Sequence, residues 1–241
     1  GKMGRAITAC VNKQDGCQIV AGVDLNNNII NDYPVYDDFN KIVETADVII
    51  DFSNPAVLDK LLDYAKEHSL PIVLATTGFS DLQTKKIYEF SKEIPLFFTF
   101  NMSLGINLLV SLAKKATSIL GDNYDIEIVE KHHNQKLDAP SGTAIMLANA
   151  INNTLDNQYI FEFDRHSKRE KRNKKEIGIH SIRGGTIVGE HDVIFAGHDE
   201  VITLSHQATS KEVFAIGAVK AAMFINDKPK GLYDMNDVIS I

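Results

Sequence analysis

Short apolar runs alternate with helix-like segments through the first hundred residues of the chain. The runs Val48–Ser53, Pro71–Ala75 and Pro95–Phe100 each have the length and the largely unbroken hydrophobic character of a buried strand. Helix-like segments begin at Asn54-Pro55, where a capping residue precedes a proline, and at the capping residue Ser80. This alternation predicts an α/β fold with a doubly wound, Rossmann-like sheet of parallel strands.

The start of the chain contains part of a dinucleotide-binding motif. Residues 1–4, Gly-Lys-Met-Gly, precede a helix expected over Arg5–Val11, and a strand expected over Gln18–Val23 ends at Asp24. In that motif a glycine turn opens the first helix, and an acidic residue about twenty positions later binds the ribose hydroxyls. We therefore expect a nucleotide fold whose first strand is absent from this chain. The alternative is that Asp24 only begins the loop after it.

Small polar residues follow three of the predicted strands. The tips are Asp51-Phe52-Ser53, Thr76-Thr77-Gly78 and Asn101-Met102-Ser103. Ligands of parallel α/β sheets bind beyond the carboxyl ends of the strands. Turn formation explains each tip singly, but their repetition predicts a cofactor that lies across all three.

Residues 25–28 bear on the choice of cofactor. Leu25 and three asparagines, Asn26 to Asn28, follow Asp24, so no arginine stands where the 2′-phosphate of NADPH would require one. This composition favours NADH, although Lys2 could supply the missing charge.

The second half of the chain predicts a different architecture. A long helix over Leu104–Leu120 ends at a glycine, and a strand over Tyr124–Glu130 follows it. Later strand-like runs without helices between them indicate a mixed or antiparallel sheet. These runs are Ile177–Ile182, Thr186–Val188, Asp192–Ala196 and Val201–His206. The chain then returns to a helix over Lys211–Ile225 and a turn over Gly231–Met235.

The densest group of reactive side chains lies in residues 130–143, E-K-H-H-N-Q-K-L-D-A-P-S-G-T. His132 is of the type best suited to proton transfer near neutral pH, and Lys136 supplies a positive charge that can hold an anion. Taken singly, the two adjacent histidines could end a strand and Lys136 could lie on a solvated loop. The density of the group favours an active site.

A predicted helix follows directly and supplies an anion site. The apolar residues of segment 144–151 recur at helical spacing, with Ser141 or Thr143 as the cap. Free N–H groups at such a helix start can bind a carboxylate or a phosphate, and Gly142 allows close approach to the main chain. Together with His132 and Lys136, this start predicts a site for an acidic small molecule.

Composition and charge argue against several other classes of protein. The chain of 241 residues has 44% hydrophobic and 24% charged residues and a net charge of −7, which does not suit a general nucleic-acid binder. Residues 165–175 are strongly basic, and we expect them to form a solvated loop rather than a phosphate-binding arm. Cys10 and Cys17 lack the spacing of a redox or metal motif, and neither a membrane-spanning run nor a secretory signal is evident. We expect a cytoplasmic protein.

Several histidines raise the question of metal binding. They are His166, His180, His191, His198 and His206. Their spacing does not place two ligands on one face, and Lys136 would repel a cation from His132. No metal site is expected.

A series of segments carries a resemblance to a known family. In chain order they are G-K-M-G, D-F-S-N-P, A-T-T-G-F, F-N-M-S-L-G-I-N, D-I-E-I-V-E-K-H-H-N-Q-K-L-D-A-P-S-G-T and S-I-R-G-G-T-I-V-G-E-H. They are similar to the dihydrodipicolinate reductases, also called 4-hydroxy-tetrahydrodipicolinate reductases, of bacterial lysine and diaminopimelate synthesis. The matches span nearly the whole chain, and the block E-x-H-H-x-x-K-x-D-A-P-S-G-T is the most specific of them.

The resemblance implies an NAD(P)H-dependent reductase that converts 4-hydroxy-tetrahydrodipicolinate to tetrahydrodipicolinate with loss of water. Hydride would pass to C4 of the cyclic imine. By position, His132 would be the proton donor or acceptor and Lys136 its companion donor, while His133, Ser141, Gly142 and Thr143 would bind the substrate carboxylates. The implied cofactor-binding residues are Gly1, Lys2, Met3, Asp24, Phe52, Ser53, Ala75, Thr76, Thr77, Thr99, Phe100, Asn101 and Met102.

The resemblance also implies the organisation of the chain. Residues 1–102 and 208–241 would form the dinucleotide-binding domain, and residues 103–207 an α+β domain with a mixed sheet for substrate binding and oligomerisation. The family is typically a tetramer assembled through that second sheet. Leu25 and Asn54 replace arginines that some members carry near the adenosine, which leaves the choice between NADH and NADPH open.

Two other functions compete with the reductase. One is a nonenzymatic nucleotide sensor that keeps the dinucleotide fold and binds a partner through residues 165–175. The other is a dehydrogenase of a different small acid. A sensor does not need a proton donor beside a group that binds carboxylates. The presence of His132 and Lys136 together therefore favours an enzyme.

Overall fold

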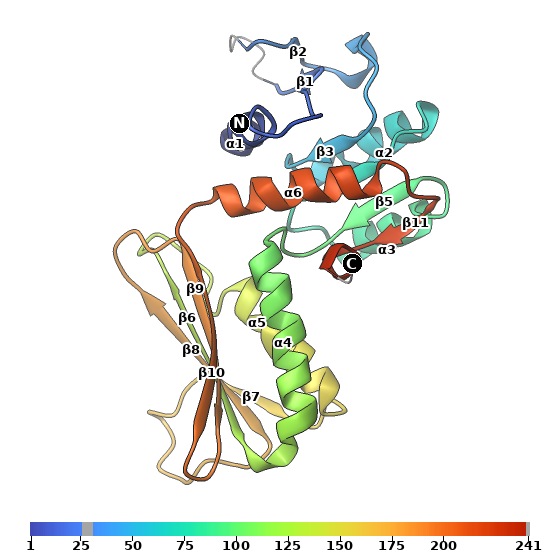
Figure 1. Ribbon diagram of the computed structural model, residues 1–241. Helices are drawn as coiled ribbons and strands as arrows, with labels where there is room; N and C mark the ends of the chain where they lie inside the picture. The colour runs from blue at the N-terminus through green and yellow to red at the C-terminus, as the bar shows by residue number, and fades with distance from the viewer. Residues whose placement is uncertain (26–30, 240–241) are drawn as a thin grey trace. The chain divides into compact units, whose positions relative to one another are not determined.

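The computed structural model describes residues 1–25 and 31–239 and divides into two compact units (Figure 1). The first unit consists of Gly1–Leu104 and Glu212–Ile241, and the second of Gly105–Lys211. Asn26 to Asn28, which bear on the choice between NADH and NADPH, lie outside the described residues. Within the described residues, no helix combines the length and the apolar character needed to cross a bilayer.

Four parallel strands form the main sheet of the first unit, in the order β11-β5-β4-β3. Their bounds are Ile49–Asp51 for β3, Ile72–Leu74 for β4, Pro95–Phe98 for β5 and Gly231–Tyr233 for β11. The sequence predicted only a turn where β11 lies, and this prediction is wrong. Three residues are too few to show the periodic pattern of a strand, so the pairing with β5 left no signal in the sequence. A separate parallel pair joins β1 (Gly22–Val23) to β2 (Val35–Tyr36).

Helices cover both faces of the main sheet. Helices α2 (Leu58–Glu67) and α3 (Asp81–Phe90) share a core with Ile72 and Leu74, whereas α6 (Glu212–Ile225) shares one with Val73. Successive strand residues point to opposite faces, which explains this division. The doubly wound fold predicted from the alternation is therefore confirmed.

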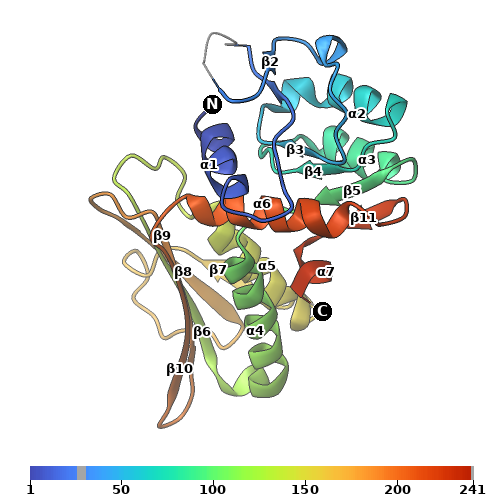
Figure 2. The same cartoon turned by 45° about the horizontal axis from the view of Figure 1, so that its top comes forward.

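The remaining helices of the first unit are short. Helix α1 (Lys2–Val11) packs beside α6 (Figure 2), and α7 (Met235–Ile239) follows β11. Two 3-10 helices, η1 (Phe39–Lys41) and η2 (Pro55–Val57), precede and follow β3.

Local capping signals in the first unit act as predicted. Asn54 accepts a hydrogen bond from the N–H of Ala56 at 2.9 Å and begins η2. Ser80 caps α3, and its backbone N–H donates to Gln83 at 3.0 Å in a reciprocal capping box.

Five strands form a mixed sheet in the second unit, in the order β10-β9-β6-β8-β7. The bounds are Asp125–His132 for β6, Ile160–Glu162 for β7, Glu176–Arg183 for β8, Gly189–Ala196 for β9 and Val201–Ala208 for β10. Strand β6 pairs in parallel with β8 and antiparallel with β9, so the predicted mixed sheet is confirmed. The strand expected over Thr186–Val188 is wrong, because this segment belongs to the turn between β8 and β9.

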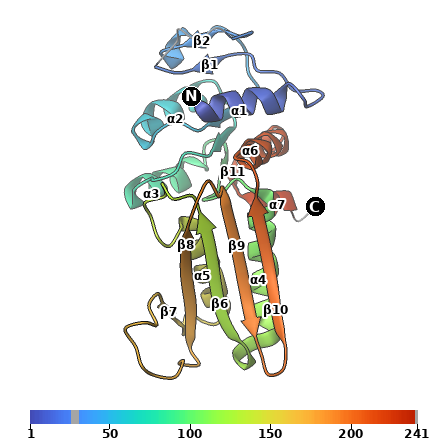
Figure 3. The same ribbon diagram turned by 90° about the vertical axis from the view of Figure 1, so that its left-hand side faces the viewer.

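Two helices cover one face of this sheet. Helix α4 (Leu104–Leu120), followed by the 3-10 helix η3 (Gly121–Asn123), and helix α5 (Gly142–Thr154) lie behind the strands in Figure 3. Ile126 and Ile128 of β6 belong to the core that they share with the sheet. We call the opposite side the open face; it carries the alternate residues of each strand, among them Glu127, Val129 and Lys131 of β6.

The basic segment of residues 165–175 is held against the acidic end of the open face. Arg172 donates to Glu127 Oε1 at 3.0 Å, to Asp125 Oδ1 at 2.9 Å and to three backbone carbonyls. Arg165 pairs with Glu176, and Lys168 with Glu162. The prediction of a solvated loop is therefore wrong for Arg172, which is half-buried, whereas most of the segment is exposed as expected. The acidic patch forms only when distant strands meet, so the local charge pattern could not reveal it.

Candidate active site

Glu130 and His132 end a row of core-facing residues on β6. The strand alternates, so Ile126, Ile128, Glu130 and His132 all point toward the side that α4 and α5 cover. Glu130 is fully buried, and His132 is 9% exposed. Glu130 and His132 therefore lie at the edge of the hydrophobic core of the second unit.

Arg183 binds Glu130 with both terminal nitrogens. In the parallel register of β6 and β8 Arg183 lies beside His132, and its guanidinium reaches back to the carboxylate. The two bonds measure 2.8 Å from Nη1 to Oε2 and 2.7 Å from Nη2 to Oε1. This bidentate geometry is the strong form of a carboxylate ion pair. Arg183 also donates to the carbonyl of Asp138 at 2.6 Å, which ties the loop after β6 to the pair.

Glu130 also accepts hydrogen bonds from groups other than Arg183. His132 Nδ1 lies 2.6 Å from Oε2, and the backbone N–H of Ser141 donates to Oε1 at 3.0 Å. Burial alone would raise the pKa of Glu130, but the hydrogen bonds from Arg183, His132, the Ser181 side chain and the Ser141 backbone outweigh it and hold the pKa at about 2. Glu130 is therefore an ionised acceptor, and the His132 nitrogen that faces it carries the proton.

Opposing influences act on His132 itself. Burial lowers its pKa, the Glu130 carboxylate opposes that change, and the positive charges of Lys136 and Arg183 reinforce it. The net result is a pKa below the ordinary value, so the imidazole is mainly neutral at pH 7 without a bound anion.

Lys136 and His133 lie in the connection between β6 and α5. The ammonium of Lys136 pairs with Asp138 Oδ1 at 2.9 Å, and the backbone N–H of Lys136 donates to the carbonyl of His133 at 3.1 Å. Both side chains are half-buried. The structure thus places them on the loop that leads from His132 to the start of α5.

Ser141 is the N-cap of α5, one of the two caps predicted. Its Oγ accepts from the N–H of Ala144 at 3.2 Å and lies 3.0 Å from Nε2 of His191. The hydroxyl and the backbone N–H of Ser141 are both engaged within the fold. A Cβ atom on Gly142 would meet no atom within 4 Å, so the first turn of α5 is open to a ligand there, with Thr143 next to it.

Sequence reasoning gave no role to Glu130 or Arg183 and considered His191 only as a metal ligand. His191 is 3% exposed, pairs with Glu130 in the register of β6 and β9, and has its ring centre 5.3 Å from that of His132. Burial lowers its pKa to about 4. The spacing of two between Glu130 and His132 was a usable signal, because it places both on one face of a strand.

The predicted cofactor residues that follow β3, β4 and β5 lie at one edge of the main sheet. Asp51 pairs with Leu74, and Leu74 with Phe98, so the residues after β3, β4 and β5 leave the sheet side by side. The backbone nitrogen of Gly1 lies 2.7 Å from Asp24 Oδ2, which brings the start of α1 to the end of β1.

One residue of this edge has an unusual environment. Thr76 is 5% exposed, and its Oγ1 has no hydrogen-bond partner among the described residues. A buried hydroxyl without a partner is costly, which fits a position that a ligand completes.

Not every residue of the predicted set can offer its side chain. Ala75 and Met102 belong to the hydrophobic core, and the carbonyl oxygen of Met102 would lie 1.7 Å from a Cβ atom on Gly217 of α6. Their contribution to a ligand is limited to the backbone. Phe52 and Asn101 are half-buried, whereas Ser53 and Thr77 are exposed, as are Lys2 and Phe100; Met3 is half-buried.

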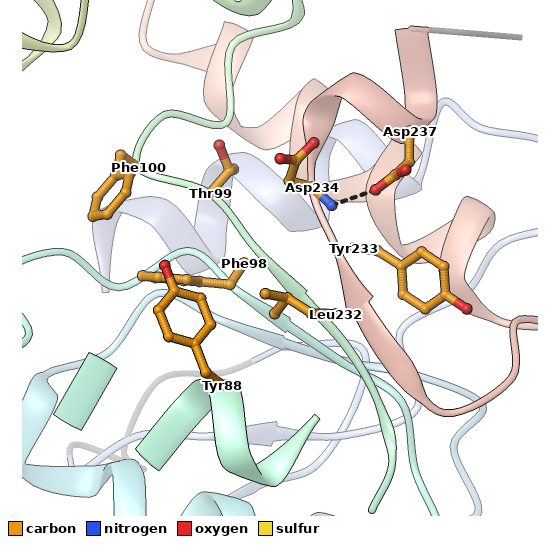
Figure 4. Close-up of a pocket in the computed structure, with 8 residues that line it drawn as sticks. All are labelled: Tyr88, Phe98, Thr99, Phe100, Leu232, Tyr233, Asp234 and Asp237. Carbon is orange, nitrogen blue, oxygen red and sulfur yellow. Dashed lines mark hydrogen bonds between the residues drawn. The ribbon is translucent and has the colours of Figure 1, made fainter. Parts of the chain in front are cut away.

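A pocket of about 170 Å³ lies beside β5 and β11 (Figure 4). It is lined by Tyr88, Phe98, Thr99, Phe100, Leu232, Tyr233, Asp234 and Asp237. Only two of the predicted cofactor residues, Thr99 and Phe100, line it, and its two carboxylates would repel the phosphates of a dinucleotide. His132 and Lys136 do not line it.

Comparisons with known proteins agree along the whole chain. The family models for the N-terminus and the C-terminus of dihydrodipicolinate reductase match residues 1–102 and 105–239. The 4-hydroxy-tetrahydrodipicolinate reductase of Clostridium novyi (strain NT) is 51% identical over 239 residues, which cover 99% of this chain and 94% of that protein. The enzyme of the same name from Caldanaerobacter subterraneus subsp. tengcongensis is 52% identical with the same coverage.

Solved structures place the fold in the same group. The dipicolinate-bound dihydrodipicolinate reductase from Paenisporosarcina sp. TG-14 is 25% identical, has a TM-score of 0.80, and aligns over 98% of this chain and 95% of that one. A probable dehydrogenase from Thermotoga maritima shares the fold alone, at 11% identity and a TM-score of 0.64 over 99% and 90% of the two chains. With both halves matched and half of all residues shared with named relatives, the chain belongs to the dihydrodipicolinate reductase family.

Proposed function

We propose that this chain, an NAD(P)H-dependent 4-hydroxy-tetrahydrodipicolinate reductase, uses His132 and Lys136 to handle the proton of the reaction. The substrate loses water and its ring gains one hydride and one proton, which gives the tetrahydrodipicolinate of lysine and diaminopimelate synthesis. Bound NAD(P)H would supply the hydride to C4 of the cyclic imine. The residues of the second unit would hold the two carboxylates and deliver the proton.

A single hydrogen-bonded cluster carries this proposal. Glu130 accepts from His132 at 2.6 Å and from the N–H of Ser141 at 3.0 Å, so one carboxylate joins the proton-transfer group to the start of α5. The N–H groups of Gly142 and Thr143, with the charge of Lys136 and the ring of His133, would bind the carboxylates of the substrate.

The charge of the substrate would also activate His132. The pKa of the free imidazole lies below its ordinary value because of burial and the nearby cations. A dianion bound beside it would oppose both influences and raise the pKa. His132 would then take up a proton as the substrate binds, and this proton would be available to the reduced ring.

We assign the cofactor to the edge of the first unit where the ends of β3, β4 and β5 meet. The hydroxyl of Thr76, which has no hydrogen-bond partner in the part of the chain that the structure describes, fits a ligand at this edge. NADH is the preferred cofactor in this proposal, because Asp24 would accept bonds from the ribose hydroxyls and repel a 2′-phosphate. Leu25, which is 95% exposed, offers no compensating charge.

We further propose a homotetramer assembled through the open face. Ile182 of β8 is 46% exposed and pairs in register with Lys131, a residue of the open face. A sheet face that α4 and α5 do not cover, with an exposed isoleucine, suits burial against a second copy. Ile182→Lys should lower the mass measured by light scattering, and an unchanged tetramer would exclude this face as the interface between subunits.

We also place the enzyme in the cytoplasm, where its free cysteines would stay reduced.

Steady-state oxidation of NADH and NADPH with freshly generated 4-hydroxy-tetrahydrodipicolinate tests the function. We expect activity with both, with the higher kcat/KM for NADH. His132→Gln and Lys136→Ala should each lower kcat by about 100-fold or more and leave NADH binding intact. His198→Gln, at a fully exposed histidine, is the matched control and should keep wild-type activity. Full activity of both site variants would show that the roles are wrongly assigned.

A further inference from the structure

We propose that Glu130 and Arg183 are positioning residues, a pair that fixes the tautomer of His132 and makes its Nε2 the atom that exchanges a proton with the substrate. This inference rests on the proposed role of His132 in the reductase reaction. It concerns two residues that the sequence did not assign and that would act on the reaction through His132.

The geometry leaves the carboxylate of Glu130 no freedom. Oε2 faces His132 at 2.6 Å and Arg183 at 2.8 Å, while Oε1 faces Arg183 at 2.7 Å and the N–H of Ser141 at 3.0 Å. These four donor atoms, together with the side chain of Ser181 on β8, hold one fully buried carboxylate. A carboxylate held in this way fixes the orientation of the His132 ring.

The bond to Glu130 decides which nitrogen of His132 is reactive. A neutral imidazole has one N–H group and one lone pair. Because ionised Glu130 can only accept, the N–H must be at Nδ1, and the lone pair is left at Nε2. After protonation, Nε2 carries the proton that can leave, since the Nδ1 proton stays bound to Glu130.

Arg183 is needed to keep this arrangement. A buried carboxylate without a cation tends to bind a proton of its own. Protonated Glu130 could donate to Nδ1 instead, which would move the remaining N–H to Nε2 and invert the roles of the two nitrogens. The bidentate contact with Arg183 prevents this inversion.

The charged groups around His132 come from three strands and one loop. Glu130 lies on β6, Lys136 on the connection to α5, Arg183 on β8 and the second imidazole, His191, on β9. Among them only Glu130 raises the pKa of His132, and Lys136 and Arg183 lower it. Removing Glu130 and removing Arg183 should therefore move this pKa in opposite directions.

The test is the pH dependence of kcat for Glu130→Gln and Arg183→Gln, measured with 4-hydroxy-tetrahydrodipicolinate and NADH. At high pH, kcat falls as His132 loses its proton. In Glu130→Gln this fall should move to lower pH by about one unit, and maximal kcat should drop at least about 10-fold. In Arg183→Gln the fall should move to higher pH. A pair with only a structural role would scale kcat equally at every pH.

Controls separate this inference from the proposed function. NADH affinity and thermal unfolding show whether each variant is folded. If Glu130→Gln does not fold, the double variant Glu130→Gln/Arg183→Gln leaves no buried charge unpaired and should still shift the fall to lower pH, by a smaller amount. Unshifted profiles, or shifts in the same direction for both single variants, would overturn the inference while His132→Gln remains inactive. Full activity of His132→Gln would instead overturn the assignment of His132.

Discussion

A Cβ atom on Gly189 would stand 3.1 Å from Nε2 of His132. This distance is tighter than an ordinary van der Waals contact, so the missing side chain at the start of β9 makes room for the reactive end of the imidazole. The backbone of Gly189 does not adopt a positive φ, so space and not backbone strain is the reason for glycine here.

Gly189→Ala should therefore impair catalysis without unfolding the protein. The added methyl would displace the ring of His132 by a few tenths of an ångström, and we expect kcat to fall about 10-fold, because misplacement of a reacting group by 1 Å costs about 100-fold. Gly184→Ala is the matched control, since a Cβ there meets no atom within 4 Å. The measurement is kcat for both variants with NADH affinity alongside. Wild-type kcat in Gly189→Ala would mean that the ring does not need this space.

Local signals explain how much of the fold could be predicted from the sequence. The strands β3, β4 and β5 are continuous apolar runs, and Ser80 with Gln83 forms a capping box that acts within four residues. Such features depend only on neighbours in the chain. By contrast, β11 exists because the last part of the chain returns to pair with β5, and no pattern in its three residues records that partner.

Some residues of the candidate site could likewise be predicted from local sequence, and others could not. His132, Lys136 and the start of α5 stand together in the sequence and could be predicted from their density. The partner of Glu130, Arg183, is 53 residues away and reaches it only through the register of β6 and β8. That register is set by tertiary packing, so a single sequence could not show which arginine, if any, would pair with the carboxylate.

Thr76→Val should separate stability from cofactor binding. Its hydroxyl is buried without a partner among the described residues, so removing it should raise the free energy of unfolding of the cofactor-free protein by about 1 kcal/mol. If the hydroxyl completes the cofactor site, the Kd for NADH should rise about 5-fold at the same time.

Thr117→Val is the control for this change. Thr117 is equally buried, but its Oγ1 donates to the carbonyl of Ala113 at 2.7 Å. Its replacement should lower the free energy of unfolding by about 1 kcal/mol and leave NADH affinity unchanged. Urea unfolding and NADH titration measure both quantities. Unchanged NADH affinity in Thr76→Val would remove Thr76 from the cofactor site.

Arg172→Ala should destabilise the second unit. The guanidinium donates to Glu127, to Asp125 and to three backbone carbonyls, so its loss removes five hydrogen bonds, two of them to carboxylates. We expect the free energy of unfolding to fall by about 2 to 3 kcal/mol. Arg169→Ala, at an exposed residue of the same segment, should change it by less than about 0.5 kcal/mol. Equal stability of the two variants in urea would show that the segment is solvated as the sequence suggested.

His191 should make the stability of the protein depend on pH between about 6.5 and 4. Burial lowers its pKa from 6.5 to about 4 in the folded state, so in this window the unfolded chain binds a proton that the folded protein does not. The contribution of His191 is present in full above pH 6.5 and falls as the pH decreases toward 4. Its total is on the order of 3 kcal/mol.

Urea unfolding at pH 7, 6, 5 and 4.5 measures this contribution in wild type and in His191→Gln. The variant should be less stable at pH 7, because the contact with Ser141 is disturbed, but its stability should decline less as the pH falls. His198→Gln, at a fully exposed ring, should keep the wild-type pH dependence. These pH values lie near or above the pKa of ordinary carboxyl groups. A difference between wild type and His191→Gln in how the free energy of unfolding changes with pH is therefore due to the imidazole. Identical slopes in these two proteins would mean that His191 is not held neutral by the fold.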